Sequence, residues 1–168
     1  MSLDVLHEPA RQTPVLGSYD VVVLGGGPAG IMAASAAAGL GCRTLLVEHY
    51  GFLGGMGTAA GVTNFCGLHA NVFGEVRQVV HGLTDELLDG LNTPHSLFGG
   101  KIAAQAYDNA AFKVAADQLT TARGVELLFH SRAVGVSLTD TRQVQALLLE
   151  TKSGRCAVRG QRFIDCSG

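Results

Sequence analysis

The feature of this 168-residue sequence that most constrains its fold is a cluster of four glycines within six residues, Gly25-Gly26-Gly27-Pro28-Ala29-Gly30. The apolar, β-branched run 19–24 directly precedes the cluster and predicts a buried parallel strand. Small residues over 29–38 predict a helix, and a second apolar run over 44–48 predicts another strand. Strand, tight turn, helix and strand in this order predict a β-α-β unit over 19–48.

The glycines have the spacing G-x-G-x-x-G, in which each glycine has a separate role. Gly25 allows the tight turn, Gly27 lets the backbone approach a pyrophosphate, and Gly30 lets the helix pack closely on the strand. Pro28 and Ala29 open the helix, where free N–H groups and the positive end of the helix dipole attract phosphates.

An acidic residue ends the second predicted strand. Glu48 follows Gly30 by 18 residues, and a carboxylate at this place can accept hydrogen bonds from both ribose hydroxyls of an adenosine. His49 comes next and is expected to pack near the same ribose. The unit therefore predicts a site for the ADP half of a dinucleotide.

A second glycine motif, Gly54-Gly55-Met56-Gly57-Thr58, follows shortly after Glu48. Gly54, Gly55 and Met56 are expected to let the backbone pass along the pyrophosphate and the flavin side of a cofactor. NAD-binding domains rarely need such a motif, so it favours FAD. An NAD-dependent dehydrogenase fragment stays open as an alternative.

The rest of the chain predicts an α/β fold, a Rossmann-like domain over 19–168 that follows a loose lead-in over 1–18. Residues 49–73 are glycine-rich and irregular, and residues 92–101 are expected to form a turn region. The further predicted elements are helices over 75–91 and 108–122, parallel strands over 125–129 and 162–166, and a β-meander over 133–138, 144–150 and 156–159 on one side of the sheet.

The run VVVLGGGPAGIMAASAAAGLGCRTLLVEHYGFLGGMGT resembles the N-terminal part of FAD-dependent oxidoreductases of the glutathione reductase superfamily. The resemblance implies a second FAD motif at 165–168, where Cys166 and Ser167 replace the usual Ala and Thr and where Ser167 and Gly168 lie against the cofactor. It also implies backbone contacts from the segment near Ala133 to the adenine.

The resemblance further implies oxidation or reduction of an unidentified small molecule through FAD. Members of the superfamily continue past the second motif into a substrate-binding part that carries the catalytic residues. We therefore expect residues 19–168 to be the FAD-binding portion alone, inactive by itself and prone to self-association through the surface that the second domain would cover. The alternative is a nucleotide-binding or assembly module without turnover of its own.

Charge and composition argue against several kinds of binding partner. A net charge of −2 gives no indication of nucleic-acid or membrane binding, and the sequence has no cysteine-histidine spacing typical of a metal site. Its four cysteines are expected to be reduced thiols, which favours a cytoplasmic location. Cys66 and His69 suggest either a redox or acid-base pair or, as we expect, a buried inert thiol and a structural histidine.

Overall fold

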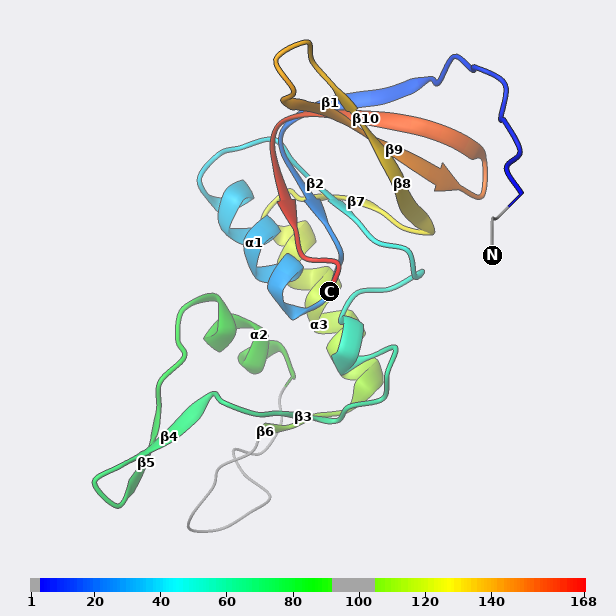
Figure 1. Cartoon of the computed structure of the whole chain (residues 1–168). Helices are drawn as coiled ribbons and strands as arrows, with labels where there is room; N and C mark the ends of the chain where they lie inside the picture. Colours follow the sequence, from blue (N-terminus) through cyan, green and yellow to red (C-terminus); the bar gives the residue numbers. More distant parts are fainter. Residues whose placement is uncertain (1–3, 92–104) are drawn as a thin grey trace.

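A computed structural model describes residues 4–91 and 105–168, and its centre is a six-stranded sheet with the order β7-β2-β1-β10-β9-β8 (Figure 1). The first four strands in this order are parallel, whereas β9 pairs antiparallel with both β10 and β8. The strands are β1 (Val15–Leu24), β2 (Thr44–Val47), β7 (Glu126–Leu128), β8 (Ser131–Leu138), β9 (Val144–Thr151) and β10 (Gly154–Asp165). The predicted α/β class, with a parallel sheet and a β-meander, is confirmed.

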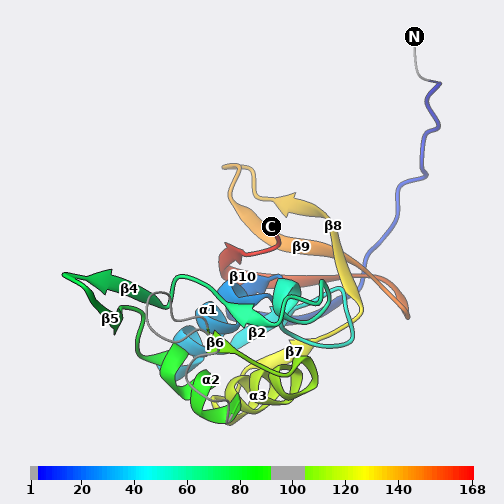
Figure 2. The same cartoon turned by 90° about the horizontal axis from the view of Figure 1, so that it is seen from below.

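Three helices cover one face of the parallel strands, and the meander folds over the other (Figure 2). They are α1 (Pro28–Gly39), α2 (Leu83–Leu91) and α3 (Asn109–Ala122). Alternation along β1 explains the layers, because Val21 and Val23 pack toward the helices while Val22 packs toward the meander. All three valines are buried, so β1 forms part of both apolar cores.

Two strands are longer than the sequence predicts. β1 begins at Val15 rather than near Tyr19, because its first residues pair with the middle of β10. β10 is a single strand, although the sequence predicted separate strands over 156–159 and 162–166. Residues 154–159 pair with β9 and residues 157–165 pair with β1, so the residues between the two apolar runs stay extended.

The helix predicted over 75–91 is wrong in its first half. Residues 69–78 instead form a hairpin of β4 (His69–Val72) and β5 (Glu75–Gln78). Its two turn residues, Phe73 and Gly74, have φ values of 51° and 92°, as a two-residue hairpin turn requires. Only α2 keeps the predicted helical pattern, with its leucines Leu87, Leu88 and Leu91 buried in the core.

The remaining elements lie in the loop after β2 and before α3. The long loop after β2 contains a short 3₁₀ turn (Gly55–Gly57) and β3 (Asn64–Phe65), which pairs with β6 (Gln105–Ala106). Asp108 caps α3 as predicted, its carboxylate accepting from the Ala111 N–H at 2.8 Å. The turn predicted over 92–101 lies outside the described residues. Within the described residues, no helix is both long enough and apolar enough to cross a membrane.

Candidate functional site

A cavity of about 480 Å³ lies at the carboxyl ends of β1, β2 and β10, beside the start of α1. Figure 1 shows the end of β10 meeting the first turn of this helix. Ligands of parallel α/β sheets bind at this kind of edge, where strand ends and a helix N-terminus converge. The residues that line it are Leu24, Gly25, Gly27, Pro28, Ala29, Val47, Glu48, His49, Tyr50, Gly55, Met56, Ser131, Arg132, Ala133, Cys166, Ser167 and Gly168.

Two positions of the first glycine motif have no room for a side chain. Gly25 has a φ of 95°, and a Cβ there would lie 2.6 Å from the carbonyl oxygen of Cys166. A Cβ on Gly30 would lie only 1.8 Å from the carbonyl oxygen of Gly25, so this glycine sets how closely α1 approaches the strand. Gly27 is different, because a Cβ there would meet nothing nearer than the Gly55 Cα at 3.9 Å. Gly27 therefore has open space beside it, at the helix N-cap.

The second glycine motif packs against the first. The Gly54 N–H donates to the Gly26 carbonyl at 2.8 Å, and Gly54 has a φ of 114°. A Cβ on Gly55 would lie 2.9 Å from the Gly27 Cα, so the two backbones touch. Met56 follows and is largely exposed on the cavity lining. The two motifs thus form one glycine-lined side of the cavity.

Glu48 is buried and held by backbone donors. Its Oε2 accepts from the Gly26 N–H at 2.6 Å, and its Oε1 accepts from the Tyr50 N–H at 2.8 Å. The His49 Nδ1 lies 2.8 Å from the same Oε1. A carboxylate offers about four acceptor positions, so acceptor capacity remains for a ligand hydroxyl. The fixed carboxylate joins the glycine turn to the end of β2.

The opposite side of the cavity comes from the start of β8 and the residues after β10. The Ser131 N–H donates to the Glu48 carbonyl at 3.0 Å, which holds Ala133 and its neighbours against the end of β2. Hydrogen bonds from the Ser167 hydroxyl and N–H lower the pKa of Asp165. Burial raises the pKa of the Cys166 thiol, and the Asp165 carboxylate adds to that shift.

The structure brings most of the predicted site residues together. Of the thirteen, all line the cavity except Gly30 and Gly54, which shape the backbone behind it. The lining residues that sequence reasoning missed are Leu24, Val47, Tyr50, Ser131, Arg132 and Cys166. The strand ends could have been inferred from the β-α-β pattern, whereas Tyr50 and Arg132 depend on long-range pairing that no local motif shows.

Cys66 and His69 do not line this cavity. Cys66 is exposed, contrary to the expectation of a buried thiol, and its Sγ lies 3.2 Å from the Asn64 amide nitrogen. The buried His69 Nδ1 has no hydrogen-bond partner among the described residues. Among the same residues, no group of three or more His, Cys, Asp or Glu side chains is placed to hold a metal ion.

The fold and cavity define a dinucleotide-binding α/β protein. The model of the FAD dependent oxidoreductase family matches residues 20–168, so the chain belongs to that family, and its cofactor is FAD. A dihydrolipoyl dehydrogenase of Trypanosoma brucei brucei is 57% identical over 45 residues, which cover 27% of this chain and 9% of that protein.

Solved structures show the same fold over about nine tenths of this chain. A geranylgeranyl bacteriochlorophyll reductase-like protein from Thermoplasma acidophilum matches with a TM-score of 0.61 and 21% identity, over 90% of this chain and 40% of that one. The anhydrotetracycline hydroxylase OxyS from Streptomyces rimosus matches with a TM-score of 0.62 and 20% identity, over 90% and 32%. A 3-ketosteroid dehydrogenase from Rhodococcus jostii matches with a TM-score of 0.62 and 15% identity, over 91% of this chain and 46% of that one. The chain therefore spans less than half of each of these proteins.

The residues present fit the ADP half of FAD. The cavity volume lies within the range of about 300–1,000 Å³ that is common for ligand pockets. The open space at Gly27 leaves room for a pyrophosphate beside the first N–H groups of α1, and Glu48 keeps acceptor capacity for a ribose.

Proposed function

We propose that this chain is the FAD-binding portion of a flavin-dependent oxidoreductase of the glutathione reductase superfamily that acts on a small molecule. The observation that carries the proposal is the open space at Gly27, which faces a cavity bounded on another side by the fixed Glu48 carboxylate. The alignment with a dihydrolipoyl dehydrogenase supports the superfamily assignment.

Each part of the cavity has a proposed task. Gly25, Gly27 and the first residues of α1, Pro28 and Ala29, hold the pyrophosphate, while Gly30 keeps the helix close enough for its N–H groups to reach it. The second glycine motif, with Gly54 behind the wall and Gly55 and Met56 on the lining, borders the path toward the flavin.

We assign the adenosine end of FAD to the side of the cavity formed by the end of β2 and the start of β8. Glu48 accepts from the ribose, His49 packs beside it, and the backbone near Ala133 contacts the adenine. Ser167 and Gly168 touch the cofactor on the side of β10. Bound FAD supplies the redox chemistry, and these protein groups supply binding and orientation.

A second candidate is a nucleotide-binding module without turnover of its own, and the lining of the cavity favours it. The Glu48 carboxylate is held by the Gly26 and Tyr50 N–H groups, which suits a binding role. Burial raises the pKa of the Cys166 thiol, which disfavours the thiolate that a nucleophile or base would need. In this reading the chain holds its cofactor and any catalytic groups belong elsewhere.

Titration of the purified chain with FAD tests the proposal. We expect saturable binding that is visible in the flavin absorbance spectrum and that excess NAD does not reverse. Failure to take up FAD would refute it, and displacement by NAD at comparable concentration would favour a nicotinamide-dependent dehydrogenase. FAD binding without reduction by any tested small-molecule donor would favour the second candidate.

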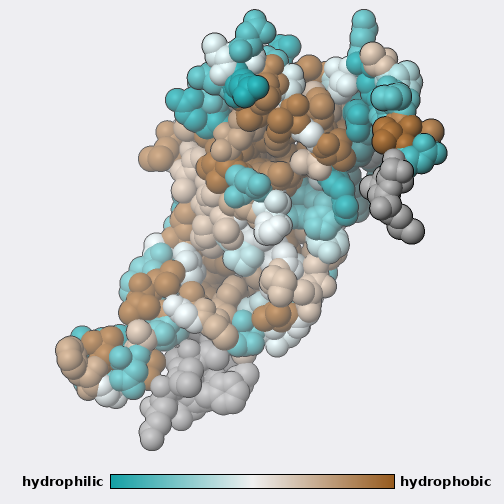
Figure 3. Space-filling view, in the orientation of Figure 1, coloured by the Kyte–Doolittle hydropathy of each residue, from teal (hydrophilic) through white to brown (hydrophobic). Residues whose placement is uncertain are grey.

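We also propose that the chain self-associates through the exposed apolar side chains of β8. Val134, Val136 and Leu138 are each more than two fifths exposed there, and Figure 3 shows hydrophobic residues gathered over this strand. Exposed apolar patches of this kind drive association. Light scattering should show particles larger than a monomer, and Val136→Lys should return the chain to a monomer. A wild-type chain that stays monomeric at high concentration contradicts this.

A further inference from the structure

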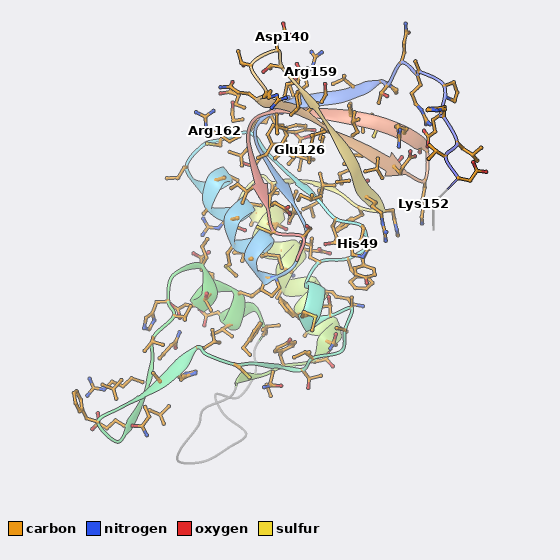
Figure 4. All side chains as sticks on the ribbon, viewed as in Figure 1. His49, Glu126, Asp140, Lys152, Arg159 and Arg162 are labelled. Atoms are coloured by element: carbon orange, nitrogen blue, oxygen red, sulfur yellow. The ribbon has the colours of Figure 1, made fainter. Side chains whose placement is uncertain are left out.

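A second cavity, of about 350 Å³, adjoins the dinucleotide cavity and shares His49 and Arg132 with it. Its other lining residues are His130, Glu150, Thr151 and Lys152. The six lining residues come from three separate segments: the residues after β2, the start of β8 with the residue before it, and the end of β9 with the turn that follows it. Figure 4 shows His49 and Lys152 at the same end of the molecule. We call this the basic cavity.

Backbone contacts fix two of these segments against each other. The His130 N–H donates to the Tyr50 carbonyl at 3.1 Å, and its φ of 53° is unusual for a residue other than glycine. A Cβ on Gly51 would lie 2.7 Å from the His130 ring, so the glycine leaves the space in which this imidazole sits. A left-handed histidine costs about 1–3 kcal/mol of strain, and it persists because the surrounding hydrogen bonds hold it.

The charge in the basic cavity is not balanced. Arg132 and Glu150 are directly paired across β8 and β9, and Arg155 faces Glu150 from β10. The Glu150 carboxylate accepts from Arg155 at 2.6 Å, so its charge is already compensated. Neither Arg132 nor Lys152 has an ion-pair partner among the described residues. Two positive charges and two imidazoles therefore border one hollow.

We propose that the basic cavity binds a phosphate group, carried either by free inorganic phosphate or by a phosphate ester. A guanidinium fork, an ammonium and imidazole N–H groups supply donors from several directions. Such an arrangement suits the three terminal oxygens of a phosphate better than the two of a carboxylate. Because the cavity lies beyond the Glu48 carboxylate and away from the start of α1, it is separate from the pyrophosphate site proposed for FAD.

Titration calorimetry with inorganic phosphate on the FAD-saturated chain tests this, with chloride at matched ionic strength as the reference. We expect saturable binding that Lys152→Ala and Arg132→Ala each weaken about tenfold or more, the effect of one charge-assisted hydrogen bond. The matched control is Arg159→Ala, an exposed arginine at the other end of the sheet (Figure 4), which should leave binding unchanged. Ribose 5-phosphate in a parallel arm distinguishes an ester from the free anion by which of the two binds more tightly.

The same titration on the FAD-free chain keeps this proposal independent of FAD binding. Phosphate binding that Lys152→Ala weakens supports the basic cavity even if the chain takes up no FAD. No phosphate binding, or binding that neither Lys152→Ala nor Arg132→Ala weakens, overturns the proposal. Circular dichroism of both variants confirms that the exposed substitutions leave the fold intact.

Discussion

Gly27→Val separates the role of a glycine in the cofactor cavity from its role in the fold. The backbone at Gly27 has a φ of −70° and a ψ of −179°, which valine can adopt without strain. A Cβ there has no neighbour closer than 3.9 Å, so the folded chain has room for it. Valine is a poorer N-cap than glycine, and we expect a loss of about 1 kcal/mol or less in the free energy of unfolding.

The same side chain occupies the space through which a pyrophosphate would approach the N–H groups of α1. Losing two charge-assisted hydrogen bonds would cost about 3 kcal/mol, or about a hundredfold in FAD affinity. FAD titration followed by flavin fluorescence measures the dissociation constant, and urea unfolding measures stability. Gly135→Val is the matched control, because a Cβ there also meets only a distant atom, Leu148 Cδ1 at 3.6 Å, and Gly135 does not line the cofactor cavity. A Gly27→Val chain that is folded and binds FAD within threefold of wild type would refute the reasoning.

Three further changes test other parts of the structure. Gly30→Ala should lower the unfolding free energy by about 3 kcal/mol, because its Cβ would overlap the Gly25 carbonyl, and thermal unfolding should show a midpoint lower by about 6–12 °C. Glu48→Gln replaces one carboxylate oxygen with an amide nitrogen, which cannot accept from a backbone N–H, so stability in urea and FAD affinity should both fall, each by about 1–3 kcal/mol. Burial raises the pKa of Asp117, whose Oδ1 has no hydrogen-bond partner among the described residues. The native state therefore binds this proton more tightly than the unfolded chain. Wild-type stability should gain from this residue as pH falls through the raised pKa, and Asp117→Asn should be more stable than wild type at neutral pH and lack that gain.

The β-α-β unit could be predicted from the sequence because local chemistry determines it. Gly25 supplies a positive φ, Pro28 opens the helix, and the valines of β1 suit a strand that is buried on both faces. The two glycine motifs also identified six of the seventeen residues that line the cavity. These features are specified within about 30 residues of each other, so no distant contact is needed to infer them.

The hairpin β4–β5 could not be predicted in the same way, because Val76, Val79 and Val80 fit a helical period as well as a strand. Two backbone conformations decide the outcome. The turn at Gly74 and the positive φ of 78° at Gly82 prevent a single helix from extending over 75–91. The basic cavity was missed for another reason. Lys152 and His49 are about 100 positions apart in the sequence. The pairing of β8 with β9 and the hydrogen bond from the His130 N–H to the Tyr50 carbonyl bring their segments together.

β10 pairs with the antiparallel β9 over its first half and with the parallel β1 from Ala157 to its end, which borders the cofactor cavity. The strand therefore cannot leave the sheet at one end without disturbing the apolar core that it shares with the meander at the other. Ligand bound at the cavity should consequently slow amide hydrogen exchange along the β9–β10 ladder, several residues from any atom that it touches.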